Sequence, residues 1–355
     1  MPGKRISFKT NLILTILFVI ASAFFLWWAN DSFGDYWSRI ITLMAIYGIM
    51  AVSYTFVNGV TGIFSLGHAG FIAVGAYTAA LLTLPIQQKA MSFFISPLIW
   101  PLNSIQIGFL PATILGGLAA ALAAFLVGYP SLRVTGDYFA IATLAFAEII
   151  RIVIQNSYSV TNGSLGLKGI PPYTTIWWAW GWLLVTLIVL GSLKFSSYGR
   201  ALRAMSEDTT AAGAMGINVF KHQLLSFVVS GFFAGIGGAL YAHWLTTIDP
   251  RPTSLGIMLT FFVLIMIVIG GLGSLSGAVL GAIFFAFSAQ WLRIVESPMN
   301  FFGITIPGIP GMSMLIFATV FILIMLFWRR GIMGKEELSW QYLYDRFRKK
   351  AGEED

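Results

Sequence analysis

Few residues in this sequence could do chemistry, and they are not arranged as a catalytic centre. The three histidines, His68, His222 and His243, lie in different regions, and none has the spacing of a metal-binding motif such as H-E-x-x-H. The absence of cysteine excludes thiol catalysis, disulfides and cysteine-bound metals. No glycine-rich loop has the G-x-x-x-x-G-K-S/T pattern that cradles phosphates. The sequence therefore predicts a protein that is not an enzyme and binds no metal or cofactor of its own.

Charged residues beside apolar runs are more informative, because burying a charge in a membrane is costly. Asp137 follows Arg133 by four residues and Arg151 follows Glu148 by three, and both spacings allow an ion pair along a helix. Gly136 weakens the helical expectation at the first pair. We interpret both as structural pairs that neutralise themselves. No row of acidic residues follows one helix, so a proton relay is not predicted.

The composition of the chain indicates the kind of fold that holds these residues. Of the 355 residues, 57% are hydrophobic and 10% charged, against roughly 25% charged in soluble domains. The sequence therefore predicts an all-α integral membrane protein. Each crossing of a ~30 Å core needs about 20 apolar residues. The expected crossings, about ten, are residues 12–28, 37–57, 58–82, 110–128, 138–154, 176–193, 224–245, 256–269, 278–292 and 312–328.

The third crossing, residues 58–82, is apolar yet rich in Gly, Ser and Thr. Such a segment is expected to be a broken or re-entrant helix, because irregular backbone is tolerated at membrane depth only where it lines protein or a wet cavity. His68 lies inside it, either facing a path or as a hydrogen-bonded buried histidine that holds the bend. His243, near a predicted helix end, is expected to lie at the membrane interface.

The distribution of basic residues predicts the orientation. Fifteen of the 21 Lys and Arg fall in residues 1–11, at Arg133, in residues 194–221 and in residues 329–355. By the positive-inside rule, both tails and the 194–221 loop are cytoplasmic. The +7 net charge is thus a topology signal rather than a sign of nucleic-acid binding. The whole chain, 1–355, is expected to be a single transmembrane domain.

The 194–221 loop is far longer than a connection between two crossings requires, and it has helix signals of its own. Ser206 is the expected N-cap of a short helix, with Glu207 and Asp208 in its first turn and Gly216 as its stop. Small residues on such a helix suit docking into another protein's groove. The alternative is a structured loop without a partner.

Two glycine-rich segments resemble each other and suggest an internal, inverted repeat. They are GIFSLGHAGFIAVGAY (residues 62–77) and GLGSLSGAVLGAIFF (residues 271–285). Interrupted hydrophobic segments in corresponding halves indicate a translocation path between them. The candidate path residues are Ser65, Gly67, His68, Gly271, Gly273 and Ser274.

Four segments together resemble the permease subunits of branched-chain amino-acid ABC transporters. They are NGVTGIFSLGHAGFIAVGAYTAALL, LRVTGDYFAIATLAFAEIIRIV followed by TNGSLGLKGIPP, the stretch from YGRALRAMSEDTTAAGAMGINVFK to GGAL, and IGGLGSLSGAVLGA. The second segment is closer to the LivM-type subunit than to its LivH-type partner. The tail, RRGIMGKEELSW, also resembles the end of this subunit.

This resemblance implies a multi-pass subunit in the bacterial inner membrane that imports leucine, isoleucine or valine. The implied partners are a LivH-type permease, two cytoplasmic ATPases that bind ATP and Mg²⁺, and a periplasmic or lipid-anchored binding protein. The residues implied to couple to the ATPases are Arg203, Ser206, Glu207, Asp208, Ala211, Ala212, Gly213 and Gly216. The alternatives are a related urea or amide importer and an ion-coupled secondary transporter, for which Glu148 is the only intramembrane candidate.

Overall fold

The computed structural model of the chain is mostly helical. It describes residues 8–32, 34–134, 136, 138–292, 299–301, 304–306, 311–327, 331–334 and 336–338. The first half contains α1 (Phe8–Ser32), α2 (Asp35–Thr55), the π-helical turn η1 (Phe56–Val60), α3 (His68–Thr83), α4 (Ile86–Ser92), α5 (Phe109–Ser131), α6 (Tyr138–Asn156), α7 (Tyr158–Thr161), the 3₁₀ turn η2 (Gly163–Leu165) and β1 (Leu167–Lys168).

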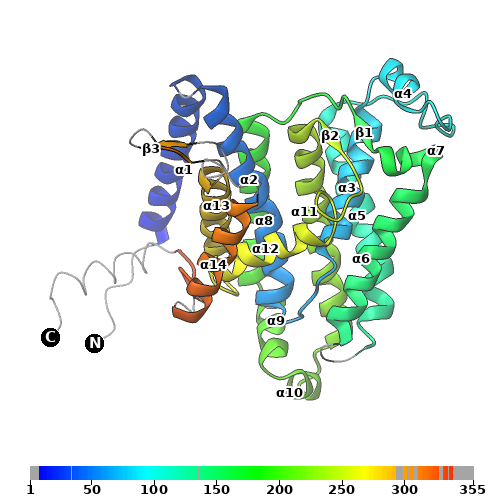
Figure 1. The fold of residues 1–355 in the computed structure, drawn as a ribbon. Helices are drawn as coiled ribbons and strands as arrows, with labels where there is room; N and C mark the ends of the chain where they lie inside the picture. Colours follow the sequence, from blue (N-terminus) through cyan, green and yellow to red (C-terminus); the bar gives the residue numbers. More distant parts are fainter. Residues whose placement is uncertain are drawn as a thin grey trace.

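The second half continues with α8 (Ile176–Phe195), α9 (Ser197–Glu207), α10 (Thr209–Ala214), α11 (Val219–Leu245), β2 (Thr247–Ile248), α12 (Ile257–Gly270), α13 (Leu275–Leu292), β3 (Met299–Phe301), β4 (Ile304–Ile306) and α14 (Met312–Phe327). The four short strands form two antiparallel pairs, β1 with β2 and β3 with β4. Figure 1 shows the long helices side by side, with β1, β2 and α4 at one end of the bundle and α9 and α10 at the other.

Among the described residues, six helices are long and apolar enough to cross a membrane: α2 with η1, α5, α6, α8, α11 and α13. The pair α3 and α4, bent by 118°, would make a seventh. The expectation of about ten crossings also counted α1, α12 and α14. At 1.5 Å per residue the 14 residues of α12 cover only about 21 Å, too little to span the bilayer core alone.

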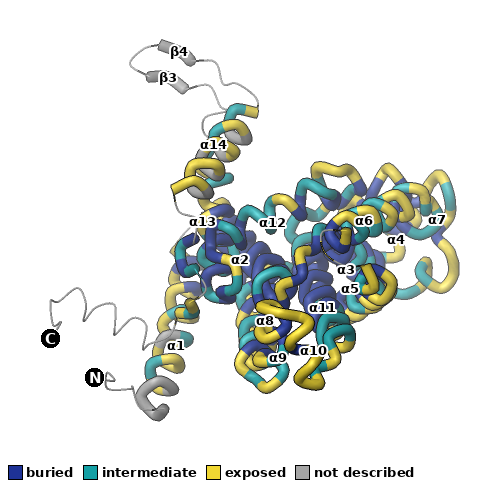
Figure 2. Tube along the Cα trace, turned by 90° about the horizontal axis from the view of Figure 1, so that it is seen from below, coloured by how far each residue is buried: buried dark blue, intermediate teal, exposed yellow. Residues whose placement is uncertain are grey.

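The centre of the bundle is formed by α2, α3, α5 and α11, where small residues let the helices touch. A Cβ on Gly75 of α3 would lie 2.2 Å from the carbonyl oxygen of Gly235 on α11, and one on Gly238 would lie 2.0 Å from that of Ile72. Backbone contact of this kind is how helices gain packing where hydrophobic exclusion from water is absent. Figure 2 shows buried stretches of α2, α3 and α11 in the interior of the bundle, while α5 is buried along only part of its length.

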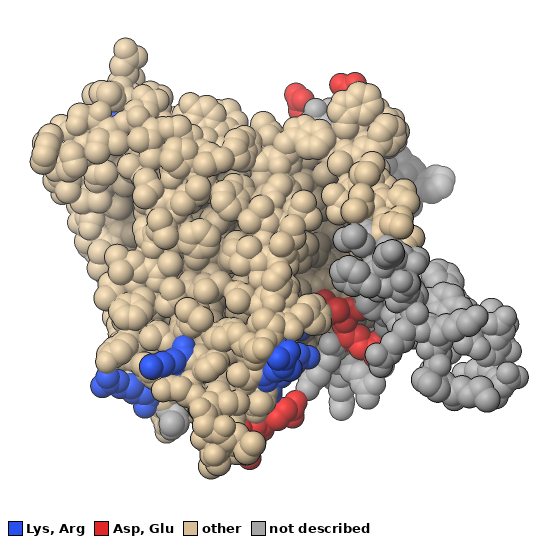
Figure 3. Space-filling view, turned by 180° about the vertical axis from the view of Figure 1, so that it is seen from behind, with Lys and Arg blue, Asp and Glu red and all other residues tan. Residues whose placement is uncertain are grey.

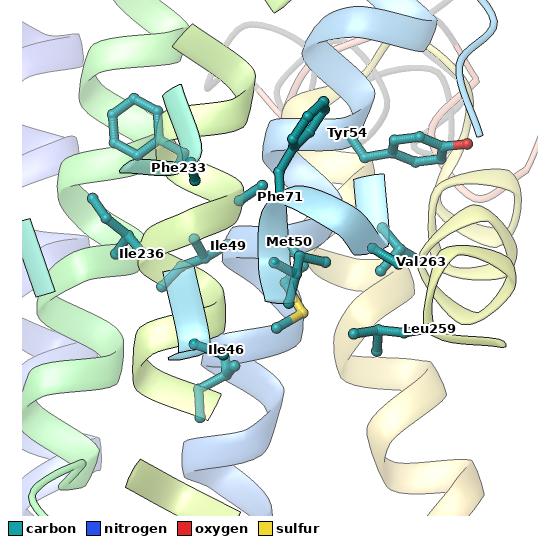
Figure 4. Close-up of a cluster of buried hydrophobic side chains, with 14 of the residues drawn as sticks. Ile46, Ile49, Met50, Tyr54, Phe71, Phe233, Ile236, Leu259 and Val263 are labelled. Atoms are coloured by element: carbon teal, nitrogen blue, oxygen red, sulfur yellow. The ribbon is translucent and has the colours of Figure 1, made fainter. Parts of the chain in front are cut away.

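Larger apolar side chains fill the remaining space beside this contact. Ile46, Ile49, Met50 and Tyr54 of α2 lie between Phe71, Phe233 and Ile236 on one side and Leu259 and Val263 of α12 on the other, as Figure 4 shows. All of them are almost fully buried. The core thus joins α2 to both halves of the chain.

His243 lies two residues before the end of α11, as predicted, but it is buried and does not face outward as an interfacial anchor would. Its side chain is fully buried, and its ring bonds to Thr83 Oγ1 (2.7 Å) and to the carbonyl of Ala239 (2.7 Å). Phe109 packs edge-on against the same ring at 4.8 Å. Hydrogen bonding on both ring nitrogens explains how an imidazole is accommodated among apolar helices.

The two segments predicted to be broken are both interrupted. Residues 61–67 form no helix or strand between η1 and α3, and residues 271–274 separate α12 from α13. Both α3 and α13 then run away from the end that carries α9 and α10 (Figure 1). The two helices that follow the breaks therefore run in the same direction.

Charged side chains on the surface concentrate at the ends of the bundle. In Figure 3 the Lys and Arg side chains gather at the α9–α10 end, and a broad belt without charge lies above them. The described basic residues of the connections at this end are Arg133, Lys194, Arg200, Arg203 and Lys221. A belt without charge between charged ends is typical of a protein that crosses a membrane.

Candidate functional site

The irregular segment 61–67 is held in place by polar side chains from the helices around it. Asn58 Oδ1 accepts a hydrogen bond from the backbone N–H of Ser65 (3.1 Å), and Tyr54 donates one to the Ser65 carbonyl (2.6 Å). On the other side, Thr143 Oγ1 of α6 accepts from the N–H of Leu66 (3.1 Å). These bonds supply partners for backbone groups of Ser65 and Leu66 that lie outside any helix or strand.

Gly67 is required where this segment meets α6. A Cβ at this position would lie 2.8 Å from the carbonyl oxygen of Thr143, which a side chain cannot occupy without moving the helix. Ser65 Oγ accepts from the Gly67 N–H (3.3 Å) and is itself 1% exposed. The predicted path residues Ser65 and Gly67 are therefore close together and closed off from solvent in this structure.

His68, the first residue of α3, is also inside. It is 2% exposed, its Nε2 lies 2.9 Å from Ser53 Oγ, and its ring packs 4.9 Å from that of Tyr54. The next N–H, that of Ala69, donates to Thr260 Oγ1 of α12 (3.1 Å). The starts of the two short helices α3 and α12 thus meet inside the bundle, with His68 at their junction.

The other three candidate path residues, around the second break, have different surroundings. Gly273 packs against η1, since a Cβ on Gly59 would lie 2.4 Å from the Gly273 nitrogen. Gly271 is covered by the chain's own C-terminal part, with a Cβ there 2.6 Å from the nitrogen of Gly334. Ser274 is fully buried and donates to Glu337 Oε2 (3.2 Å). In this conformation these residues contribute to packing.

The 194–221 loop is folded into two helices, α9 and α10, with caps that differ from the prediction. Ser206 is not an N-cap: it lies in the last turn of α9 and donates to the Arg203 carbonyl (2.8 Å). Asp208 is the N-cap of α10 and accepts from the N–H groups of Thr210 (2.8 Å) and Ala211 (3.0 Å). Glu207 ends α9 rather than starting a helix.

The predicted stop at Gly216 is confirmed. Its φ of +85° is the left-handed conformation, its N–H donates to Gly213 (3.0 Å), and the N–H of Ile217 reaches back to Ala212 (3.2 Å). This is the pair of bonds of a Schellman motif. The helix α10 therefore has a defined end.

The two helices divide their residues between the bundle and the surface. Leu202 and Met205 of α9 and Ala212 of α10 are buried. The exposed residues include Arg203, Ala211, Gly213, Met215 and Gly216, with Met215 83% exposed. Figure 1 shows α10 projecting from the end of the bundle. The exposed Met215 and the small residues beside it give α10 an apolar surface with few protruding side chains.

One contact joins this surface layer to segment 61–67. Gly62 has a φ of +75°, and a Cβ there would lie 2.7 Å from Cβ of Ser206. The last turn of α9 therefore rests directly on the start of segment 61–67. His68 follows Gly62 by six residues along the chain.

The predicted ion pairs have separate outcomes. Arg151 Nε lies 2.7 Å from Glu148 Oε2, and Arg151 also donates to Gln155 and to the Pro250 carbonyl. Arg133 donates to the hydroxyl of Tyr129 and lies over its ring at 4.7 Å. The other member of that pair, Asp137, lies outside the described residues.

The prediction missed an ion pair between Lys194 and Glu337, which lies where the second break meets the C-terminal segment. A signal was present: Lys194 is a lone basic residue at the end of a strongly apolar helix, and such a charge needs a partner if it is buried. Its partner is 143 residues away, and no local pattern identifies it.

A metal centre and a pocket are the other kinds of site that the part of the chain described by the structure could hold. No three His, Asp or Glu side chains there gather into a metal-binding group. An open groove of ≈ 410 Å³ between α5, α8 and α11 is lined by apolar side chains such as Trp182, Val229 and Phe233, and none of the predicted path residues lines it.

A helical bundle with several membrane-length helices, a neutral belt and interrupted inner segments defines a multi-pass membrane protein of the permease class. The family model described as "Branched-chain amino acid transport system / permease component" matches residues 36–326. The chain belongs to this family.

Several named relatives support this assignment. The chain is 31% identical over 319 residues to the high-affinity branched-chain amino acid transport system permease protein LivM of Escherichia coli K12, covering 80% of this chain and 69% of the relative. It is 26% identical over 262 residues to the LivH protein of Salmonella typhimurium, covering 68% and 80%. A probable LivM of Methanocaldococcus jannaschii is 24% identical over 332 residues, covering 86% and 95%. No solved structure matches significantly.

Proposed function

We propose that this chain is the LivM-type permease subunit of an ATP-driven importer of branched-chain amino acids. The observation that carries the proposal is the pair α9 and α10, a folded and exposed surface at the basic end of a membrane protein of this family. In such an assembly the chain conducts the substrate and hydrolyses nothing. ATP and Mg²⁺ belong to two separate ATPase subunits, and the chain itself binds no cofactor.

The proposed partners follow from what this chain lacks and from the names of its relatives. Relatives named LivM and LivH are both similar to it, which supports pairing with a LivH-type permease. We propose that the ATPases bind a surface of α9 and α10. The exposed residues of this surface are Arg203, Glu207, Asp208, Ala211, Gly213 and Gly216. Ala212 is buried and supports these exposed residues from beneath, while Ser206, itself exposed, contacts Gly62. A binding protein on the other side delivers the substrate.

The orientation that we propose has ten crossings, with both tails and α9–α10 in the cytoplasm of a bacterial inner membrane. The gathering of Lys and Arg at the α9–α10 end supports it, by the positive-inside rule. In this arrangement the irregular segment 61–67 and α3 together make the third crossing. The short helix α12 makes the eighth with the chain that precedes it.

The path is proposed to run past Ser65, Gly67 and His68. Irregular backbone at membrane depth, held by side chains from α2, α6 and α12, is the feature expected where a transporter opens and closes. Closure of the ATPases would move α9, and the contact between Ser206 and Gly62 would carry this displacement to the segment. Gly273 supports the segment through Gly59, while Gly271 and Ser274 hold the second break.

An ion-coupled transporter is the less favoured proposal, since Glu148 is already paired with Arg151. The test is reconstitution of the chain with its LivH-type partner, the two ATPases and the binding protein in sealed vesicles. We expect leucine, isoleucine or valine uptake that requires ATP and the ATPases. Uptake that continues without them, or that is driven by an ion gradient alone, would refute the proposal. Uptake of urea or amides in place of these amino acids would correct the substrate.

A further inference from the structure

The described C-terminal residues 331–334 and 336–338, which we call the tail segment, are built into the break between α12 and α13. The N–H of Ile332 donates to the Ile269 carbonyl (2.9 Å) and that of Met333 to the Gly270 carbonyl (3.0 Å). A Cβ on Gly331 would lie 2.7 Å from the carbonyl oxygen of Val268. The tail segment therefore supplies hydrogen bonds to carbonyls at the end of α12, which have no partner within that helix.

The carboxylate of Glu337 does the same for the start of α13. It accepts from the backbone N–H groups of Leu275 (2.8 Å) and Ser276 (2.9 Å), from Ser276 Oγ (2.6 Å) and from Ser274 Oγ (3.2 Å). A carboxylate at a helix N-terminus satisfies unpaired N–H groups and interacts favourably with the helix dipole. Glu337 thus caps α13 from 61 residues away in sequence.

The carboxylate of Glu337 is joined to the helices α9 and α10 through Lys194. The Lys194 ammonium bonds to both Glu337 Oε1 and the carbonyl of Gly273. Lys194 lies in the last turn of α8, two residues before Ser196, whose hydroxyl caps α9 by accepting from Gly199 (3.4 Å). The side chains of the pair are only 7% and 18% exposed, so loss of one partner would leave the other charge desolvated and unpaired.

We propose that Glu337 is a positioning residue for transport: through Lys194 it makes the start of α9 and the start of α13 move as one body. The inference rests on the proposed function. Its physical reason is the break between α12 and α13, where Gly271 (φ +115°) and Gly273 (φ +99°) allow the backbone to rotate. Without the carboxylate, displacement of α9 by the ATPases would be absorbed in this break and would not reach α12 and α13.

The test uses Glu337→Gln, with Glu336→Gln as the matched control. Glu336 is the neighbouring acid and is exposed, so its neutralisation removes the same charge without touching the helix cap. In the reconstituted importer we expect Glu337→Gln to co-purify with the ATPases and to hydrolyse ATP. Uptake per ATP should fall by at least about tenfold, equivalent to about 1.4 kcal/mol. Glu336→Gln should resemble the wild type.

Two results would overturn the proposal. Equal uptake per ATP in the two variants would mean that Glu337 has no role in transport. Loss of ATPase co-purification in Glu337→Gln would mean that it only supports the fold of the docking surface. Failure of the proposed function itself is distinguishable, because the wild-type complex would then show no ATP-dependent uptake.

A covalent replacement of the ion pair gives a second measurement. The chain has no cysteine, so Lys194→Cys with Glu337→Cys introduces a unique pair of thiols. If the two positions move together, joining them with a short bifunctional maleimide should raise uptake per ATP above that of the unlinked double variant. No change, or a further loss, would contradict movement as one body.

Discussion

The contact between Gly62 and Ser206 is the step at which motion of α9 is proposed to enter the membrane, and Gly62→Ala tests it. Two costs are expected. A non-glycine residue in the left-handed conformation, with φ of +75°, costs about 1–2 kcal/mol. The new methyl group would also lie 2.7 Å from Ser206 Cβ, and such overpacking costs about 1–3 kcal/mol. The sum is about 2–5 kcal/mol.

Gly136→Ala separates these two costs. Gly136 has a similar φ of +66° and no other group within 4 Å of a Cβ, so it carries the backbone cost without the clash. The clash itself is relieved by Ser206→Gly, which removes the atom that the methyl group would meet. We therefore expect the double variant Gly62→Ala/Ser206→Gly to recover about 1–3 kcal/mol relative to the sum of its single variants.

The assay is thermal unfolding of the purified permease pair in detergent, together with uptake per ATP in the reconstituted importer. Gly62→Ala should unfold at a lower temperature than Gly136→Ala, and the double variant should regain part of both stability and uptake. The reasoning is refuted if Gly136→Ala is as damaging as Gly62→Ala, or if the four variants of the cycle are additive.

The remaining predictions concern the surface of α10 and the tail segment. Asp208→Ala should weaken ATPase co-purification, because loss of an N-cap costs about 1 kcal/mol, whereas Asp208→Asn keeps the acceptor and should not. Gly213→Arg should abolish co-purification without lowering the amount of membrane-inserted protein, since a Cβ there meets nothing within 4 Å; Ala212→Arg should lower that amount, because Ala212 is buried. Burial alone would raise the pKa of Glu337, but hydrogen bonds from Lys194 and Ser276 and the Lys194 charge outweigh it and hold the pKa below its usual range. Its stabilising contribution is therefore present above the unfolded pKa of about 4.3 and lost as pH falls through the lower folded value. The Tm difference between wild type and Glu337→Gln should be constant near neutral pH and shrink only at pH below about 4; shrinkage between pH 6 and 8 would contradict this assignment.

Local signals in the sequence were sufficient to predict the folded loop between α8 and α11 and its end. Glycine is the residue type that adopts the left-handed conformation without steric cost, and Gly216 follows a run of good helix formers. The N-cap was assigned to the wrong residue because Ser206 and Asp208 are both favoured at that position. The outcome depends on a tertiary contact, since Ser206 packs against Gly62 while still in the last turn of α9.

The interior of the candidate site depends on contacts that no local pattern records. The interruptions at residues 61–67 and 271–274 were predicted from their Gly and Ser content. Their partners were not: Thr143 is 77 residues from Leu66, and Thr260 is 191 residues from Ala69. The sequence also provided no indication that Gly271, in the break at residues 271–274, is covered by the tail segment.

The central claim is that α10 is the surface through which a separate ATPase drives this permease. The most direct measurement is cross-linking from Gly213→Cys, which would be the only cysteine in the chain and lies on the exposed side of α10. In the assembled importer we expect a short thiol-reactive cross-linker to join this position to an ATPase subunit, and only to that subunit. The account is contradicted if no such product forms, or if a membrane-impermeant thiol reagent labels this cysteine from outside intact cells.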